Sequence, residues 1–184
     1  MSTHERQLNQ VRRALVMSWI AAAVIPAQAR ANAYRDIGWS ALSPPGWNHM
    51  EGLSDLVAEA EDLPDDDPRA KALMDKLRAA GNQSPTVDAM NGVDVMLPGY
   101  AVAPDDAVMP GLSQFLLVPY LGSCIHSPPP PSNQTLNCRA TEPIIGLRSM
   151  DAIWVFGRLR IERTVSPTGV AAYSLQVARV ERQS

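Results

Sequence analysis

The sequence predicts a mixed α+β fold, namely a small five-stranded β-barrel of the OB type that follows two short helices and an extended arm containing tryptophan. Two observations support it. Apolar residues recur at helical spacing up to Gly81, and from Asp88 onward they alternate as in strands, with turn residues between short runs. Five strands, a glycine kink in the first and a long connection before the last hairpin fit a closed barrel. A small sandwich is the competing architecture.

The first 33 residues have the features of a cleavable export signal. A basic start is followed by an apolar run shorter than the ~20 residues of a membrane span, and the small residues A-N-A end at Ala33. We expect a signal peptide over residues 1–33, cleavage after Ala33, a periplasmic location and no membrane span in the mature form. Cys124 and Cys138 are the only cysteines, so no cysteine near the cleavage site offers a lipid anchor.

Removal of 33 of the 184 residues leaves 151, enough for one domain. We separate an arm and helical segment, residues 34–87, from an OB-like barrel domain, residues 88–184. These 151 residues carry 12 Lys and Arg against 18 Asp and Glu. Because phosphate binding needs a basic face, this acidic balance argues against nucleic acid as a partner.

The arm and the helices precede the strands. Residues 39–47 contain two tryptophans and the turn P-P-G, which keeps the arm from being helical. Residues 49–63 and 68–81 repeat apolar side chains at helical spacing. Pro68 suits the first turn of the second helix, and Gly81 suits its C-terminal cap.

The five expected strands are residues 93–102, 114–121, 135–139, 151–163 and 171–181. In the fourth strand, aliphatic Ile153, Val155 and Leu159 alternate with residues that include Arg158 and Arg160, so one face is apolar and the other turns basic. The fourth and fifth strands are joined by T-V-S-P-T-G-V, a hairpin loop.

Residues 115–134 read F-L-L-V-P-Y-L-G-S-C-I-H-S-P-P-P-P-S-N-Q. This run resembles the signature F-L-L-V-P-Y-x-G-x-C-I-H-x-P-P-P-P-x-N-Q of a bacterial exported-protein family, domain of unknown function 3299. Weaker similarity extends over most of the predicted mature chain. The resemblance implies an exported, often periplasmic or lipid-anchored protein, and some relatives lie near transport or metal-homeostasis components. Cys138 and the missing lipidation cysteine depart from the family pattern.

The two cysteines leave several interpretations open. A disulfide between Cys124 and Cys138 would close a short proline-rich loop in an oxidising compartment. The metal alternative, for zinc or copper, uses Cys124, His126, Cys138 and His49. Its spacing is not a standard zinc framework, and one sulfur cannot serve both as a disulfide and as a thiolate ligand. Buried free thiols are a further interpretation. A Cys-His enzyme would need a third group to orient the histidine, and the sequence indicates none.

We therefore predict a non-catalytic binding or accessory module rather than an enzyme, with no cofactor. The tetraproline must be extended and polyproline-like, which suits a stiff rim. The predicted binding rim comprises Tyr120, Cys124, His126, Pro128, Pro129, Pro130, Pro131, Asn133 and Gln134. The expected partners are a small ligand, a metal, or an envelope protein such as a transporter component.

Overall fold

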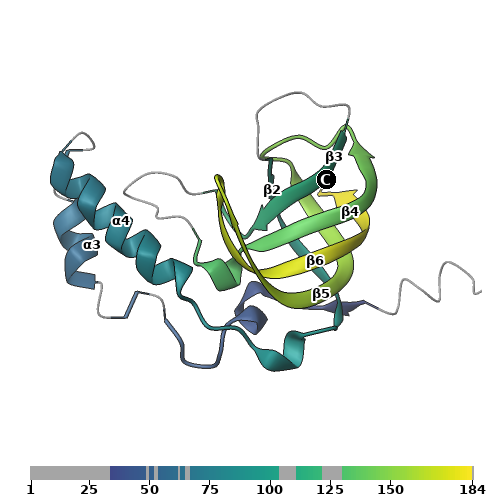
Figure 1. The fold of residues 1–184 in the computed structure, drawn as a ribbon, viewed down its shortest axis with the longest axis horizontal. Helices are drawn as coiled ribbons and strands as arrows, with labels where there is room; N and C mark the ends of the chain where they lie inside the picture. Colours follow the sequence, from purple (N-terminus) through teal and green to yellow (C-terminus); the bar gives the residue numbers. More distant parts are fainter. Residues whose placement is uncertain are drawn as a thin grey trace, which may run out of the picture. The chain divides into compact units, whose positions relative to one another are not determined.

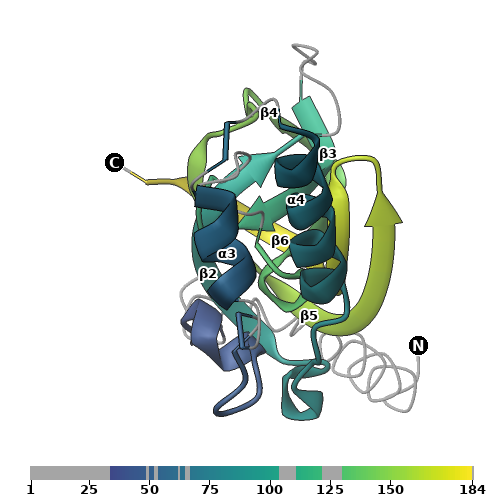
Figure 2. The ribbon, with the colours of Figure 1, turned by 90° about the vertical axis from the view of Figure 1, so that its left-hand side faces the viewer.

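The computed structural model describes residues 34–48, 50–51, 54–61, 63–64, 67–103, 111–121 and 130–183. Tyr34–Ser184 forms one compact unit, which Figures 1 and 2 show from two directions. Its elements in chain order are β1 (Arg35–Asp36), η1 (Trp39–Leu42), α3 (Ser54–Glu61), α4 (Pro68–Asn82), η2 (Asp88–Met90), β2 (Asp94–Val102), β3 (Gly111–Val118), η3 (Ser132–Gln134), β4 (Leu136–Ile145), β5 (Ala152–Ser166) and β6 (Gly169–Arg182).

The five long strands form a closed ring of pairings. β2 pairs with β3, β3 with β4, β4 with β6, β6 with β5, and β5 returns to β2. Only the β4–β6 contact in this ring is parallel. The mixed α+β class predicted from the sequence is confirmed.

The predicted number of strands is wrong, because the described residues form six. β1 lies in the arm and pairs in parallel with β2 at Val95 and Met96. Two residues are too few to show the period-2 alternation by which a strand is detected in a sequence. β4 is also longer than expected and runs to Ile145. This end was not predicted because the residues after Arg139 are mostly exposed and do not alternate between apolar and polar side chains.

The interior of the ring is filled by alternate residues of each strand. In β5, Ile153, Val155 and Leu159 are fully buried, whereas Arg158 and Arg160 are exposed, so the alternation predicted for this strand is confirmed. β2 alternates in the same way along its whole length. Burying a large aliphatic side chain contributes roughly 1.5–3 kcal/mol, so these alternate positions supply the main stabilisation of the ring.

The two predicted helices are confirmed as α3 and α4, which lie side by side (Figure 2). α4 begins as expected, with Pro68 in its first turn and the Asp67 carboxylate accepting a hydrogen bond from the Arg69 N–H at 2.8 Å. Gly81 is not the predicted cap but lies inside the helix. A Cβ there would stand 3.4 Å from the Pro131 Cα, so the glycine permits close packing of α4 on Pro131.

The arm lies along the part of β2 that β3 does not pair with. β3 pairs with β2 only at residues 100–102, which leaves the preceding part of β2 without β3 beside it. The indole N–H of Trp39 donates to the carbonyl of Pro98 at 2.7 Å, and the Ile37 N–H donates to the carbonyl of Met96 at 3.2 Å. The arm therefore satisfies backbone groups that a neighbouring strand would otherwise pair.

Candidate functional site: a cleft between α4 and the strands

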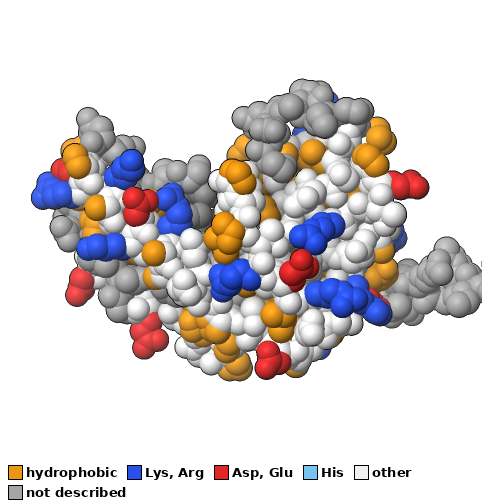
Figure 3. Space-filling model, viewed as in Figure 1, with side chains coloured by type: hydrophobic (Ala, Val, Ile, Leu, Met, Phe, Trp, Pro, Cys, Tyr) orange, Lys and Arg blue, Asp and Glu red, His pale blue; other side chains and the backbone are white. Residues whose placement is uncertain are grey.

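A cleft of about 1080 Å³ lies between α4 and one end of the strand ring. Figure 3 shows the hollow, with Lys and Arg side chains on the α4 side and apolar side chains along the strand side. Lys71, Met74, Asp75 and Arg78 form the α4 wall. Their spacing of three, four and seven residues places them on one face of the helix.

The strand wall of the cleft is uncharged, and its apolar part belongs to the outer face of the ring, beside hydroxyl side chains that include Ser149 and Thr168. Val102 of β2 is paired with Leu116 of β3, and Val118 follows two residues later on the same face. Because the intervening Leu117 points into the core, Leu116 and Val118 point outward, yet each is only 7% exposed. Val170 of β6 extends this wall, so apolar side chains of three strands line the cleft.

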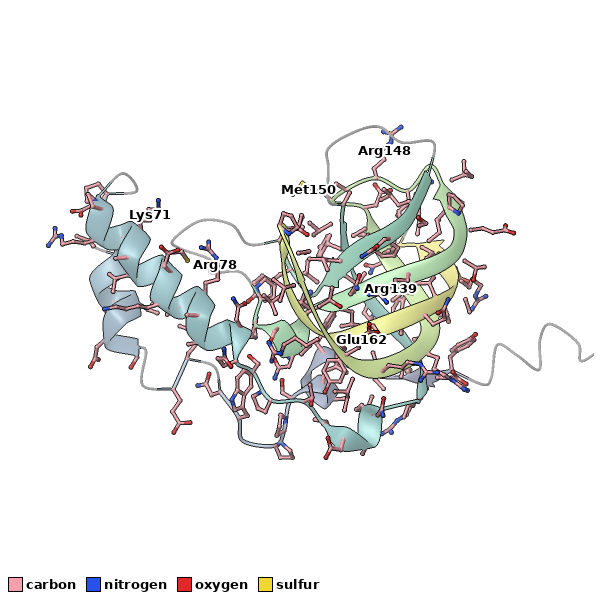
Figure 4. The ribbon with its side chains drawn as sticks, in the orientation of Figure 1. Lys71, Arg78, Arg139, Arg148, Met150 and Glu162 are labelled. Carbon is pink, nitrogen blue, oxygen red and sulfur yellow. The ribbon has the colours of Figure 1, made fainter. Side chains whose placement is uncertain are left out.

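The charged groups of the described cleft lining are confined to α4. Arg78 and Asp75 form an ion pair at 2.9 Å, with more than half of each side chain exposed. Among the residues that the structure describes, Lys71 forms no ion pair. Figure 4 shows Lys71 and Arg78 projecting from the same side of α4, with Met150 on the strand side of the hollow. The described part of the lining thus has two cations against one anion.

Two members of the predicted binding rim line this cleft. Tyr120 is 39% exposed, and partial burial raises the pKa of its hydroxyl, which keeps the phenol neutral. Pro130 also belongs to the lining. The structure therefore brings one residue from each side of the segment 122–129 to the same cavity.

Three further members of the predicted rim hold the fold together and do not line the cleft. Pro131 is buried against α4. The Asn133 amide donates to the carbonyl of Pro85 at 3.0 Å, and the Gln134 amide donates to the carbonyl of Trp39 at 3.1 Å. These side chains fix the arm and the segment after α4 to the ring. Cys124, His126, Pro128, Pro129 and the metal candidate His49 lie outside the described residues.

Cys138 lies in the core of the ring. Its side chain is fully buried, between Phe115 of β3 and Leu175 of β6 in the strand register, and it forms no disulfide with a described residue. Burial raises the pKa of this thiol far above its usual range, so the sulfur stays protonated. Within the described ranges, no three His, Cys, Asp or Glu side chains are grouped to hold a metal ion. The disulfide and the metal site stay predictions.

We expect Cys138 to be inert toward thiol reagents in the folded protein. In a Cys124→Ser variant this is the single thiol left, and it should react with a chromogenic disulfide reagent only after urea is added. Thiol titration before and after denaturation measures this. Full reaction in the absence of urea, with circular dichroism unchanged, would contradict the buried position of Cys138.

Sequence reasoning missed the α4 wall and Met150. Lys71 and Arg78 look like ordinary solvent-facing cations of an amphipathic helix, and only the position of α4 beside the strands makes them part of a cavity. The described residues include no helix with the length and apolar character needed to cross a membrane.

The fold and the cleft define a mixed α+β protein with a ring of five paired strands, a sixth strand from the arm and a cavity covered by a helix. The family model for proteins of unknown function called DUF3299 matches residues 39–182, so the chain belongs to this family, as the sequence resemblance predicted. The crystal structure of a DUF3299 family protein from Pseudomonas aeruginosa PAO1 is similar with a TM-score of 0.58 and 29% identity. The match covers 83% of this chain and 97% of that chain.

A second solved structure is much less similar. It is a small single-stranded DNA-binding protein from Streptomyces coelicolor, with a TM-score of 0.32 and 15% identity over 50% of this chain and 95% of that chain. A likeness this weak carries no argument about fold or ligand. No curated protein matches the chain.

Proposed function

We propose that this protein is a non-catalytic binding module of the bacterial envelope and that its binding site is the cleft between α4 and the strands. The observation that carries the proposal is a cavity of about 1080 Å³ whose charged groups all lie on α4 in the described lining and whose other wall offers apolar side chains beside a few hydroxyls. Pockets for small ligands combine these features, namely a mostly apolar lining with a few polar groups that fix orientation. The export-type N-terminal sequence supports an envelope location.

The proposal includes an OB-like barrel as the architecture of the ring. The support is the order β2-β3-β4-β6-β5 with a return to β2, together with the single parallel contact between β4 and β6. Proteins of that architecture bind ligands on the face of their second and third strands and on the adjoining loops. Here the second ring strand, β3, and the loop between β5 and β6 both line the cleft.

The metal alternative and the envelope partner are proposals with less support. Zinc or copper binding would draw on Cys138, whose buried thiol would have to lose its proton and leave the core. Association with a transport or metal-homeostasis component rests on the family resemblance.

The cleft is tested with N-phenyl-naphthylamine, a neutral apolar dye whose fluorescence rises on burial. We expect saturable binding to the wild-type protein. Leu121→Glu should weaken it about tenfold, because Leu121 lines the cleft and a carboxylate there disfavours an apolar ligand. Ile145→Glu is the matched control, since Ile145 is 75% exposed and does not line the cleft. Absence of binding, or equal weakening by both variants, would refute the cleft as a binding site.

A further inference from the structure

We propose that the ligand of the cleft is an anionic amphiphile, with its head group at Lys71 and Arg78 and its apolar body against the strand wall. This inference rests on the proposed function of the cleft and specifies its ligand. The ligand class is defined by one negative group, such as a carboxylate or sulfonate, joined to an alkyl or aromatic body.

The charge of the cleft differs from that of the whole chain. The chain has a formal net charge of −3, yet the described lining holds Lys71 and Arg78 against Asp75 alone. A cationic ligand would meet a net positive wall, whereas an anion is attracted to it. The positions of Lys71 and Arg78 in the cavity of an otherwise acidic protein therefore favour a negatively charged ligand.

Both cations are available to a ligand. Lys71 has no ion-pair partner among the described residues. The pair between Arg78 and Asp75 is solvent-exposed and links residues three apart on one helix, a kind of contact that is easily exchanged. The planar guanidinium of Arg78 suits a two-oxygen head group, and Lys71 adds a compact charge.

The spacing of the two cations suits one head group. Seven residues correspond to two helical turns, a rise of about 10 Å along the axis of α4. Lysine and arginine side chains are long enough to converge over this separation, and Figure 4 shows both projecting from the same side of the helix. The cations therefore define one place for the negative group.

The strand wall provides a continuous surface for the rest of the ligand. Val102 of β2 pairs with Leu116 of β3, Val118 lies two residues further along β3, and Met150 adds a flexible side chain that is 60% exposed. Methionine adapts its shape to different apolar partners. Because the charges of the described lining lie on α4 alone and the opposite wall is uncharged and partly apolar, a ligand that contacts both walls is itself amphipathic.

The test compares two dyes that share one aromatic body. Anilinonaphthalene sulfonate carries a negative group, and N-phenyl-naphthylamine lacks it. We expect the sulfonate to bind at least about tenfold more tightly at low salt and to lose this advantage as salt rises. Decanoate should displace it, whereas decyltrimethylammonium, which has the same chain length, should not.

Variants of α4 connect the preference to the proposed residues. Lys71→Ala and Arg78→Ala should each weaken sulfonate binding about fivefold to tenfold and leave binding of the neutral dye unchanged. Lys76→Ala is the matched control, because Lys76 is exposed on the same helix but does not line the cleft. Circular dichroism confirms that each variant is folded.

The outcomes separate the ligand class from the cleft itself. If the neutral dye binds as expected but the sulfonate binds no more tightly, or if Lys71→Ala and Arg78→Ala leave sulfonate binding unchanged, the anionic assignment is wrong and the binding cleft stands. If the neutral dye does not bind, the proposed cleft is refuted, and the ligand class that rests on it is refuted with it.

Discussion

Replacing Tyr173 with phenylalanine is expected to lower the free energy of unfolding by about 2–4 kcal/mol. The ring of Tyr173 is fully buried in the core, and its hydroxyl makes two hydrogen bonds. It donates to the carbonyl of Leu42 at 2.9 Å and accepts from the Val87 N–H at 2.7 Å. Phenylalanine fills almost the same volume but leaves both backbone groups without their partner, so the loss measures the hydrogen bonds rather than a cavity. Urea denaturation followed by fluorescence gives the difference.

The control for this prediction is Tyr100→Phe. Tyr100 is half-buried in β2, and its hydroxyl makes no hydrogen bond within the described part of the chain, so we expect a change below about 0.5 kcal/mol. Equal losses of unfolding free energy in the two variants would mean that the hydrogen bonds of the Tyr173 hydroxyl do not stabilise the fold.

The hydroxyl of Tyr173 also predicts a dependence on pH. Burial raises the pKa of Tyr173 above its ordinary value of 10.0, so the folded state holds this proton more firmly than the unfolded state. The resulting contribution to stability is present below pH 10.0 and is lost as the pH rises through the folded-state pKa. Between pH 10.0 and the folded-state pKa, Tyr173→Phe should therefore lose stability less steeply than the wild type, as urea denaturation at several pH values would measure.

Replacing Gly157 with alanine is expected to cost about 3 kcal/mol or more, because the new methyl group meets backbone rather than a movable side chain. A Cβ at this position would overlap the carbonyl oxygen of Gln176, and it would lie 3.0 Å from the carbonyl carbon and 3.1 Å from the Leu175 Cγ. Gly157 also stands where the register between β5 and β6 shifts. The two longest strands of the ring would have to separate at this point.

Gly38→Ala is the matched glycine control. The nearest atom to a Cβ at Gly38 is the Ser40 Oγ at 3.7 Å, an ordinary contact, and the backbone there has a φ of −81°. We expect its stability to stay within about 0.5 kcal/mol of the wild type. A thermal denaturation series of the three proteins measures the difference, and an unchanged Gly157→Ala midpoint would contradict the described β5–β6 pairing.

Much of the fold is predictable because its signals are local. The alternation along β5 depends only on the period of a strand, and Pro68 marks the start of α4 by its own covalent geometry. β1 was missed because its two residues acquire strand structure only by pairing with β2. The exposed residues at the end of β4 were missed for the same reason, since β3 rather than their own composition makes them a strand.

The candidate site was predicted only in part, because tertiary packing forms it. Tyr120 and Pro130 were identified from one continuous segment, whereas the cleft joins α4 to strands far away in the sequence. Asn133 and Gln134 were expected at a rim. They are instead oriented toward carbonyls of the arm and of the segment after α4. A sequence does not show whether a polar side chain after four prolines faces solvent or a backbone group.

The attachment of α4 has a mechanical consequence for the cleft. Its C-terminal end is bonded to η3 and to β5, because the Asn82 carbonyl accepts hydrogen bonds from the Ser132 hydroxyl and the Arg163 guanidinium. Arg163 also donates to the carbonyl of Ser84 at 3.4 Å. At a rise of 1.5 Å per residue, Lys71 lies about 16 Å along the helix from Asn82, and Arg78 lies about 6 Å from it. A tilt of α4 about this end therefore moves Lys71 almost three times as far as Arg78.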